Sequence, residues 1–246
     1  MPYGNYRRRP SSAARMAAAK KAFARRKARL ARPRSLTSQI KSISLSNSET
    51  KTAGLYENGL NLLHNTTRYV VNLLKTSQGD TANPGTVMYS NRIGNEVVAR
   101  GLKIKLQFIS DPTRPNLNVR WFVFRYEANE TPSDANFWVG TAGAGGNMNR
   151  MLDYPDTRNV TILKSGMIQN RNKLPTGEAT DPVNNVYRDV WIPLRNRKIR
   201  YDANNSEVPK YTTIGMAFVA YDANNSLQTD IIQYLSYTTR FYFKDP

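Results

Sequence analysis

The residues of this sequence with the clearest chemistry are positively charged and lie close together at its start. Residues 1–48 contain 13 Lys and Arg and no Asp or Glu, and residues 49–246 contain the other 23 basic residues and all 18 acidic ones. The first segment therefore carries +13 and the remainder +5, which together give the net charge of +18. Closely spaced Lys and Arg neutralise phosphates and release counterions without reading base sequence. The sequence predicts a nucleic-acid-binding arm followed by a nearly balanced body.

We expect basic side chains of the arm to carry most of this binding. Two alternatives exist for such a segment, a solvated charged tail and a cleaved, Arg-rich transit peptide. The same clusters would also satisfy a nuclear-import signal. Basic residues on predicted strands of the body could extend the phosphate-binding surface or form only a solvated strand face. The predicted nucleic-acid-binding residues are Arg7, Arg8, Arg9, Arg15, Lys20, Lys21, Arg25, Arg26, Lys27, Arg29, Arg32 and Arg34 of the arm, and Lys103, Lys105, Arg197 and Arg200 of the body.

Few residues offer catalytic or metal-binding chemistry. The chain has no cysteine and one histidine, His64, which excludes thiolate zinc sites, cysteine nucleophiles and multi-histidine metal sites. Asp153 and Asp156 could contribute to a calcium site, although carboxylates that cap or solvate a turn are the simpler interpretation. The glycines within residues 140–146 lack the Gly-Lys-Ser/Thr ending of a P-loop. We therefore predict neither an enzyme, nor a metal site, nor a cofactor.

The arm's composition predicts a helix over residues 12–32. Ala, Arg and Lys are strong helix formers, and Pro33 would end the helix. Many like charges repel one another along such a helix, so we expect it to order mainly against an anion or a partner chain. The predicted organisation is an arm over residues 1–34, a polar linker over 35–58 and one domain over 59–246.

The body has the periodicity of an all-β protein. Residues 102–108 alternate apolar and polar side chains, which predicts a half-buried strand, and residues 119–126 are apolar on both faces. Pro- and Asn-rich turns, and not long helices, separate the strand-like runs, so we predict an antiparallel β-sandwich. No apolar stretch approaches the roughly 18 residues of a membrane-spanning helix. The other strand-like runs cover residues 160–168, 187–192, 197–201, 212–221 and 232–243.

Several short motifs of the body resemble the capsid proteins of very small icosahedral viruses. The similar families are the circovirus-like capsids of circular single-stranded DNA viruses and the coat proteins of plant satellite necrosis viruses. Circovirus arms are near-continuous Arg tracts, whereas this arm is spaced by Ala, as in the satellite viruses. The motifs are Asn-Arg-Ile-Gly-Asn-Glu-Val at 91–97, Arg-Gly-Leu-Lys-Ile at 100–104, Val-Arg-Trp-Phe-Val-Phe-Arg at 119–125, Thr-Ile-Leu-Lys at 161–164 and the basic run 194–201.

The resemblance implies a jelly-roll sandwich that assembles into a sixty-subunit, T=1 shell with the arm inside on the genome. The implied partners are other copies of the chain and a single-stranded genome, with DNA slightly favoured over RNA. The implied location is the virion, and the host nucleus during assembly if the genome is DNA. The alternative is a cellular single-strand-binding or ribosome-associated protein with a basic extension.

Overall fold

The chain divides into two compact units, Met1–Asn47 and Ser48–Pro246. The computed structural model describes residues 48–78, 91–110, 116–139, 149–171, 185–202, 207–223 and 227–245 of the second unit. In the first unit it describes six residues, all helical and exposed, namely Lys20, Leu36, Thr37, Gln39, Ile40 and Ile43. The helix predicted over 12–32 therefore lies outside the described residues except at Lys20.

Antiparallel strands make up most of the second unit as far as the structure describes it. They begin at Lys51, earlier than the predicted start of the body at residue 59, because β1 and β2 both pair with the last strand. The elements are β1 (Lys51–Ala53), β2 (Tyr56–Leu63), β3 (Thr67–Val70), β4 (Glu96–Ser110), β5 (Asn116–Glu127), the short helix α3 (Asp134–Phe137), β6 (Thr161–Arg171), β7 (Asn185–Arg200), β8 (Thr212–Asp222) and β9 (Ile231–Lys244).

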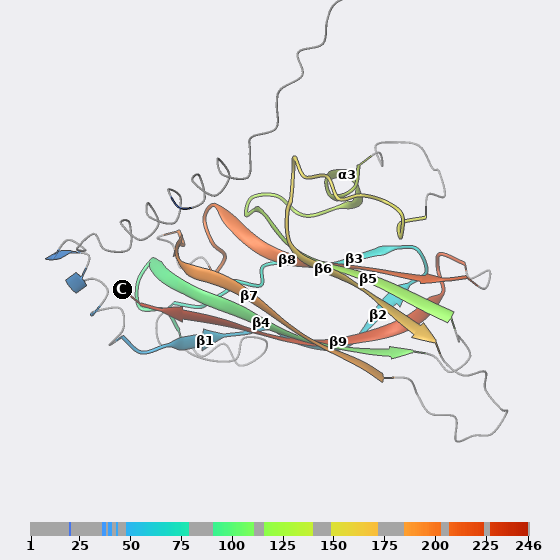
Figure 1. Ribbon diagram of the computed structural model, residues 1–246, viewed down its shortest axis with the longest axis horizontal. Coiled ribbons are helices and arrows are strands. Elements are labelled where there is room, and N and C mark those ends of the chain that lie inside the picture. The colour runs from blue at the N-terminus through green and yellow to red at the C-terminus, as the bar shows by residue number, and fades with distance from the viewer. Residues whose placement is uncertain are drawn as a thin grey trace, which may run out of the picture. The chain divides into compact units, whose positions relative to one another are not determined.

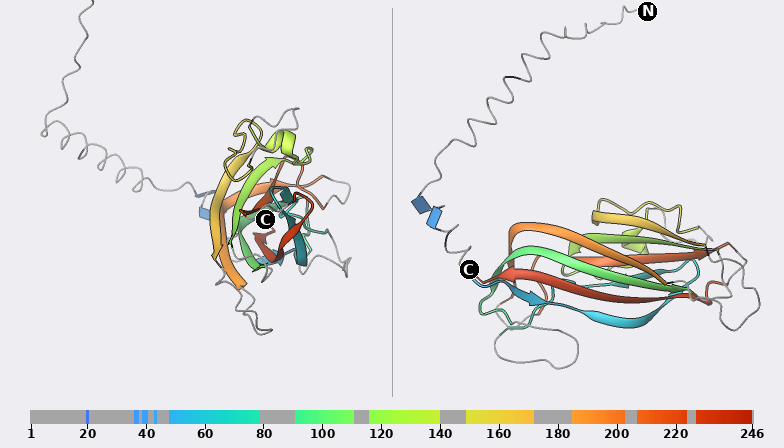
Figure 2. Two further views of the ribbon diagram at one scale, coloured as in Figure 1. Left: turned by 90° about the vertical axis from the view of Figure 1, so that its right-hand side faces the viewer. Right: turned by 60° about the horizontal axis from the view of Figure 1, so that its bottom comes forward.

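The strands form two sheets that lie on each other as layers (Figure 1). The first sheet has the order β1-β9-β4-β7, with β2 also paired to β9, and the second has the order β3-β8-β5-β6. Figure 2 shows the long strands of each sheet lying side by side. The orders β2-β9-β4-β7 and β3-β8-β5-β6 are those of a jelly roll, built from two Greek keys. The predicted fold, an all-β jelly-roll antiparallel sandwich, is confirmed.

The main core fills the space between the two sheets. On β4, the apolar side chains within residues 102–108 are almost fully buried, and the intervening Lys103, Lys105 and Gln107 are not. On β9, Leu235, Phe241 and Phe243 are fully buried. The second sheet contributes inward side chains such as Trp121 of β5 and Phe218 of β8. The alternation of apolar and polar residues in the sequence therefore corresponds to the inward and outward faces of the first sheet.

A second apolar cluster covers the outer face of the second sheet. Phe122, Phe124 and Tyr126 alternate with the inward residues of β5 and pack against Phe137 and Trp138, which follow β5 in the chain. The ring centroids of Phe124 and Phe137 are 4.8 Å apart. The prediction that residues 119–126 are apolar on both faces is confirmed, because β5 is buried between two cores.

One strand differs from its prediction. The runs 187–192 and 197–201 were expected to be separate, but both belong to β7, which is continuous from Asn185 to Arg200. The two halves join at Arg195 and Asn196, which have φ angles of 53° and 59°. This irregularity lies opposite a register shift in β4 between Ala99 and Gly101. Such bulges bend a strand and change which face its side chains point to.

Removing Phe137 should destabilise the second cluster. Phe137→Ala leaves a cavity among the four aromatic rings that contact Phe137, and we expect it to lower the free energy of unfolding by about 3–5 kcal/mol. Val139→Ala, two residues away at a half-exposed position, is the matched control and should cost less than about 1 kcal/mol. Denaturant unfolding of the full-length chain measures both. Equal effects of the two changes would contradict the assignment of a second core.

Raising the pH should lower the free energy of unfolding, because a buried tyrosine ionises less readily in the folded chain than in the unfolded chain. Burial raises the pKa of Tyr201, whose hydroxyl donates to the Leu74 carbonyl over 2.8 Å, from 10.0 to about 12. The folded chain then holds this proton more tightly than the unfolded chain, so stability is complete below pH 10 and falls as the pH rises from about 10 to 12. Denaturant unfolding across this range should show a shallower decline for Tyr201→Phe than for the unaltered chain. An unchanged slope would contradict the prediction.

Candidate nucleic-acid interface

The residues predicted to bind nucleic acid fall in three places. All those of the arm lie outside the described residues except Lys20, which is helical and exposed. Of the four in the body, Lys103, Lys105 and Arg200 point outward from the first sheet, while Arg197 points inward between the sheets. The structure therefore does not bring the four body residues into one cluster.

Lys103 and Lys105 lie in the middle of the outer face of the first sheet. Lys103 is flanked across the sheet by Trp191 of β7 and Arg240 of β9. Its Nζ is 3.9 Å from a carboxylate oxygen of Asp189, and both side chains are well exposed. An ion pair of this length in solvent contributes little stability, so Lys103 retains most of its capacity to bind a phosphate.

Arg200 has an acidic partner. Its Nε lies 3.1 Å from Oε2 of Glu96, and Lys198 donates to the other oxygen of the same carboxylate. The hydrogen bond from Lys198 is the main reason that the pKa of Glu96 is lowered. Glu96 thus offsets one of the two positive charges, and this end of the sheet keeps a net charge of +1 from the three side chains. The phosphate-binding role of Arg200 stays a prediction.

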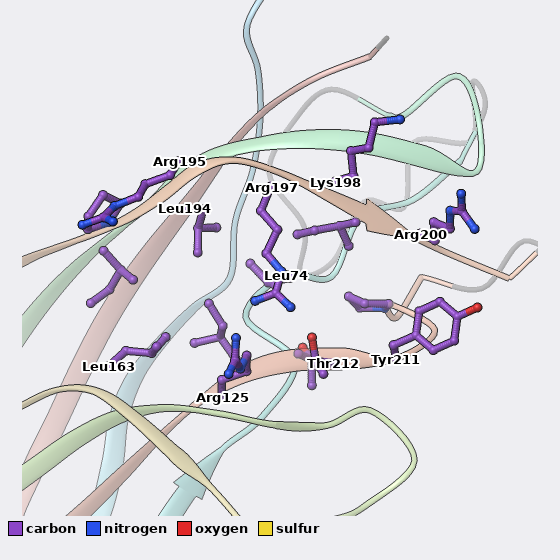
Figure 3. A pocket seen from close by; sticks show the side chains of 16 residues that line it. Leu74, Arg125, Leu163, Leu194, Arg195, Arg197, Lys198, Arg200, Tyr211 and Thr212 are labelled. Carbon is purple, nitrogen blue, oxygen red and sulfur yellow. The ribbon is translucent and has the colours of Figure 1, made fainter. Parts of the chain in front are cut away.

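A cleft of about 310 Å³ opens between the two sheets where β7 ends and β8 begins. The close-up in Figure 3 shows the side chains of Arg197 and Arg125 entering this space from opposite sheets, while those of Lys198 and Arg200 turn away from it. The described lining of the cleft contains no acidic residue, and its charged members are all basic: Arg125, Arg195, Arg197, Lys198 and Arg200. The lining residues are Leu74, Arg125, Leu163, Ile192, Pro193, Leu194, Arg195, Arg197, Lys198, Ile199, Arg200, Pro209, Tyr211, Thr212, Thr213 and Ile214.

The irregularity in β7 is the reason that Arg197 faces this cleft. Val190 and Ile192 are buried at even-numbered positions, whereas Ile199 is buried at an odd-numbered one. The residues of β7 that face the core are therefore even-numbered before Arg195 and Asn196 and odd-numbered after them. Without this change, Arg197 would point outward from the sheet, as Trp191 does.

Arg125 completes the cleft and was not among the predicted site residues. It lies on β5 with the same parity as Trp121 and Val123, which face the main core. One of its Nη atoms is 3.4 Å from Oγ1 of Thr161, a weak contact. A charged residue at an inward position of an apolar strand was the sequence signal that could have identified it. Each of the two guanidinium groups in the cleft offers a planar fork of donors that fits phosphate oxygens.

The residues considered for catalysis and metal binding have structural partners. His64 accepts a hydrogen bond at Nδ1 from the backbone N–H of Asp222 over 3.2 Å and packs on Tyr221. Asp153 pairs with Arg150, and Asp156 accepts hydrogen bonds from the side chain and the backbone N–H of Arg158. Within the described ranges, no group of three or more His, Asp or Glu side chains is arranged to hold a metal ion. The same ranges contain no helix long and apolar enough to cross a membrane.

Comparisons with known proteins give distant structural likenesses only. No family model and no curated protein matches the chain. A chain from the structure of Desmodium yellow mottle tymovirus is similar at 10% identity and a TM-score of 0.33, covering 80% of this chain and 87% of the other. A chain from the T13 IBDV viral particle is similar at 10% identity and a TM-score of 0.29, covering 80% of this chain and 36% of the other. Both scores are low, and the jelly-roll assignment rests on the strand order of the chain itself.

Replacing Arg197 should weaken anion binding to the body. Arg197→Gln removes one of the two guanidinium groups of the cleft, so phosphate should raise the melting temperature of this variant less than that of the unaltered chain. Arg188→Gln is the matched control, because it removes the same charge from an exposed position on the other half of β7. The measurement is thermal unfolding in phosphate against sodium chloride at equal ionic strength. Equal responses of the two variants would argue against an anion site in the cleft.

Proposed function

We propose that this chain is a viral capsid protein that assembles into a closed icosahedral shell and packages a single-stranded genome through its basic arm. The observation that carries the proposal is that one chain combines two features: an N-terminal segment of charge +13 without acidic residues, and a jelly-roll body of nearly balanced charge. Jelly rolls occur in viral capsids, lectins and cupins, so the fold alone does not decide among these functions. The arm favours a capsid because it supplies the charge that a packaged genome requires.

The first residue of the body unit, Ser48, lies at an end of the first sheet that carries several basic side chains. Ser48, the first residue of the body unit, accepts a hydrogen bond at its carbonyl from Nζ of Lys244 over 2.5 Å. Lys244 pairs across the first sheet with Val98, and Val98 pairs on its other side with Lys198. The chain therefore enters the sheet at the end that also carries Lys198, Arg200 and the cleft.

An exposed apolar patch supports contacts between subunits. Val139, Leu152 and Tyr154 all belong to the connection between β5 and β6 and are 50%, 74% and 75% exposed. Val139 and Tyr154 lie side by side, since the N–H of Val139 donates to the carbonyl of Tyr154 over 2.9 Å, and Leu152 is two residues from Tyr154 in the chain. Clustered apolar side chains on a surface are typical of sites that bind another protein. A neighbouring copy of the chain is the partner that a shell would provide.

The charge of the arms fits a small genome. A T=1 shell has sixty subunits, whose segments 1–48 at +13 each would supply about 780 positive charges, enough to offset on the order of a thousand phosphates. We favour single-stranded DNA slightly over RNA on the resemblance to circovirus-like capsids, and with a DNA genome assembly would take place in the host nucleus. The competing function, a cellular single-strand-binding protein with a basic extension, requires no shell.

Electron microscopy and light scattering of the purified full-length protein test the proposal directly. We expect closed particles of megadalton mass that contain nucleic acid. Only monomers or small oligomers under every ionic condition would overturn the capsid function and favour the cellular binding protein.

Deleting residues 1–34 should abolish packaging and preserve the body. The deletion removes 12 of the 36 basic residues and none of the described strands. Thermal unfolding of the body should therefore change little, while affinity for single strands should fall steeply. For the full-length chain, the logarithm of the binding constant should fall with the logarithm of salt concentration by about 0.7 per neutralised phosphate. If the truncated chain binds as tightly with the same salt slope, the arm is not the packaging element.

A further inference from the structure

Aromatic and basic side chains share the outer face of the first sheet. In one row across the sheet, Lys103 of β4 lies between Trp191 of β7 and Arg240 of β9. Two residues along β4, in the next row on the same face, Gly101 lies beside Tyr242 of β9. The face therefore presents aromatic rings and cations as immediate neighbours.

The same mixture continues along the strands. Gln107 lies opposite Tyr187 of β7 and donates from Nε2 to its hydroxyl oxygen over 2.9 Å. Tyr187 is four residues from Trp191, which places their Cα atoms about 13 Å apart along the strand. At the other edge, Tyr56 of β2 pairs with Thr238 of β9. Exposed rings thus extend over most of the width of the sheet.

The ring of Trp191 is packed against its neighbours and is still partly exposed to solvent. Its six-membered ring lies over Gly101, where a Cβ atom would come within 2.2 Å of Cζ2. Its ring centroid is 5.7 Å from that of Tyr242. Despite these contacts the side chain is 47% exposed. A ring that is fixed on one side and open on the other can stack with a ligand at little cost in conformational entropy.

The charge of this face favours nucleic acid over a protein partner. Among the outward-facing residues of β4, β7 and β9 in the rows from Gly101 to Gln107, the cations are Lys103, Lys105 and Arg240, and the carboxylate is that of Asp189. The centre of a protein–protein interface is usually depleted of charged residues, and Lys is under-represented there. Surfaces that bind single strands instead combine positive charge for the backbone with rings on which bases stack.

We propose that the outer face of the first sheet is a base-stacking platform for single-stranded nucleic acid, with Trp191 at its centre. Bases stack on Trp191 and Tyr187, and Lys103, Lys105 and Arg240 bind the adjoining phosphates. This inference rests on the proposed packaging function and extends it. The arm neutralises backbone charge in a salt-sensitive way, whereas the platform holds bases by contacts that persist at higher salt.

Tryptophan fluorescence gives a direct test on the full-length chain. Of the three tryptophans, Trp121 and Trp138 are 6% and 1% exposed, so quenching by a bound base reports on Trp191. The probes are an oligothymidylate about twelve nucleotides long and an abasic oligonucleotide of equal length. We expect oligothymidylate to quench the fluorescence and the abasic strand to bind, by anisotropy, without quenching.

Variants then separate stacking from general packing. At salt high enough to weaken the arm, Trp191→Ala should lower the affinity for oligothymidylate by about 5-fold to 100-fold, the range found when one stacking ring is removed. Trp191→Phe keeps a ring and should restore most of the affinity. Met167→Ala is the control, because Met167 is 52% exposed on β6 of the other sheet. Affinity for the abasic strand should be the same for all three variants.

The results distinguish this inference from the packaging function. Tight binding of both probes without any change in Trp191 fluorescence would overturn the platform and leave packaging by the arm intact. Protection of Trp191 from acrylamide in particles emptied of nucleic acid would show that a second copy of the chain covers the face, and would also overturn it. Failure of the full-length chain to bind either probe would overturn both proposals.

Discussion

Burial of apolar side chains between two sheets is the constraint on which the rest of this structure depends. Successive side chains on a strand point to opposite faces, so fixing Leu102 and Ile104 inward places Lys103 and Lys105 outward. The same rule on β9 buries Phe241 and leaves Arg240 exposed. The chemistry that the first sheet displays is thus a consequence of how its core packs.

The second sheet meets this constraint on both of its faces. β5 places Val119, Trp121 and Val123 in the main core, and Phe122 and Phe124 in the cluster under α3. Covering the outer face in this way uses the connection between β5 and β6, which then carries its own apolar side chains to the surface. Within the described part of the chain, this connection covers the outer face of the second sheet, while Trp191 on the outer face of the first sheet is 47% exposed.

Departures from regular alternation create the remaining features of the interface. The reversal at Arg195 and Asn196 sends Arg197 between the sheets, opposite Arg125, and leaves Arg200 outside with Glu96. A regular strand would have placed Arg197 on the outer face beside the aromatic residues. The basic run at the end of β7 therefore contributes Arg197 to the cleft and Arg200 to the outer side of the sheet.

Charge and side-chain alternation are local properties, so the charged N-terminal segment, the strand periods and the burial of β5 on both faces could be predicted from the sequence, and with them the all-β sandwich. The sequence did not determine that residues 187–192 and 197–201 form one strand, nor that Arg197 and Arg200 point to opposite faces. These depend on how β7 pairs with β4 across the shift at Ala99 and Gly101, and so on contacts between residues distant in the chain. For the same reason Arg125 was missed as a partner of Arg197, and the grouping of Trp191 with Lys103 and Arg240 emerged only from the register of three strands. Only the tertiary structure decides such neighbours, because pairing energy between distant segments, and not local pattern, sets the register.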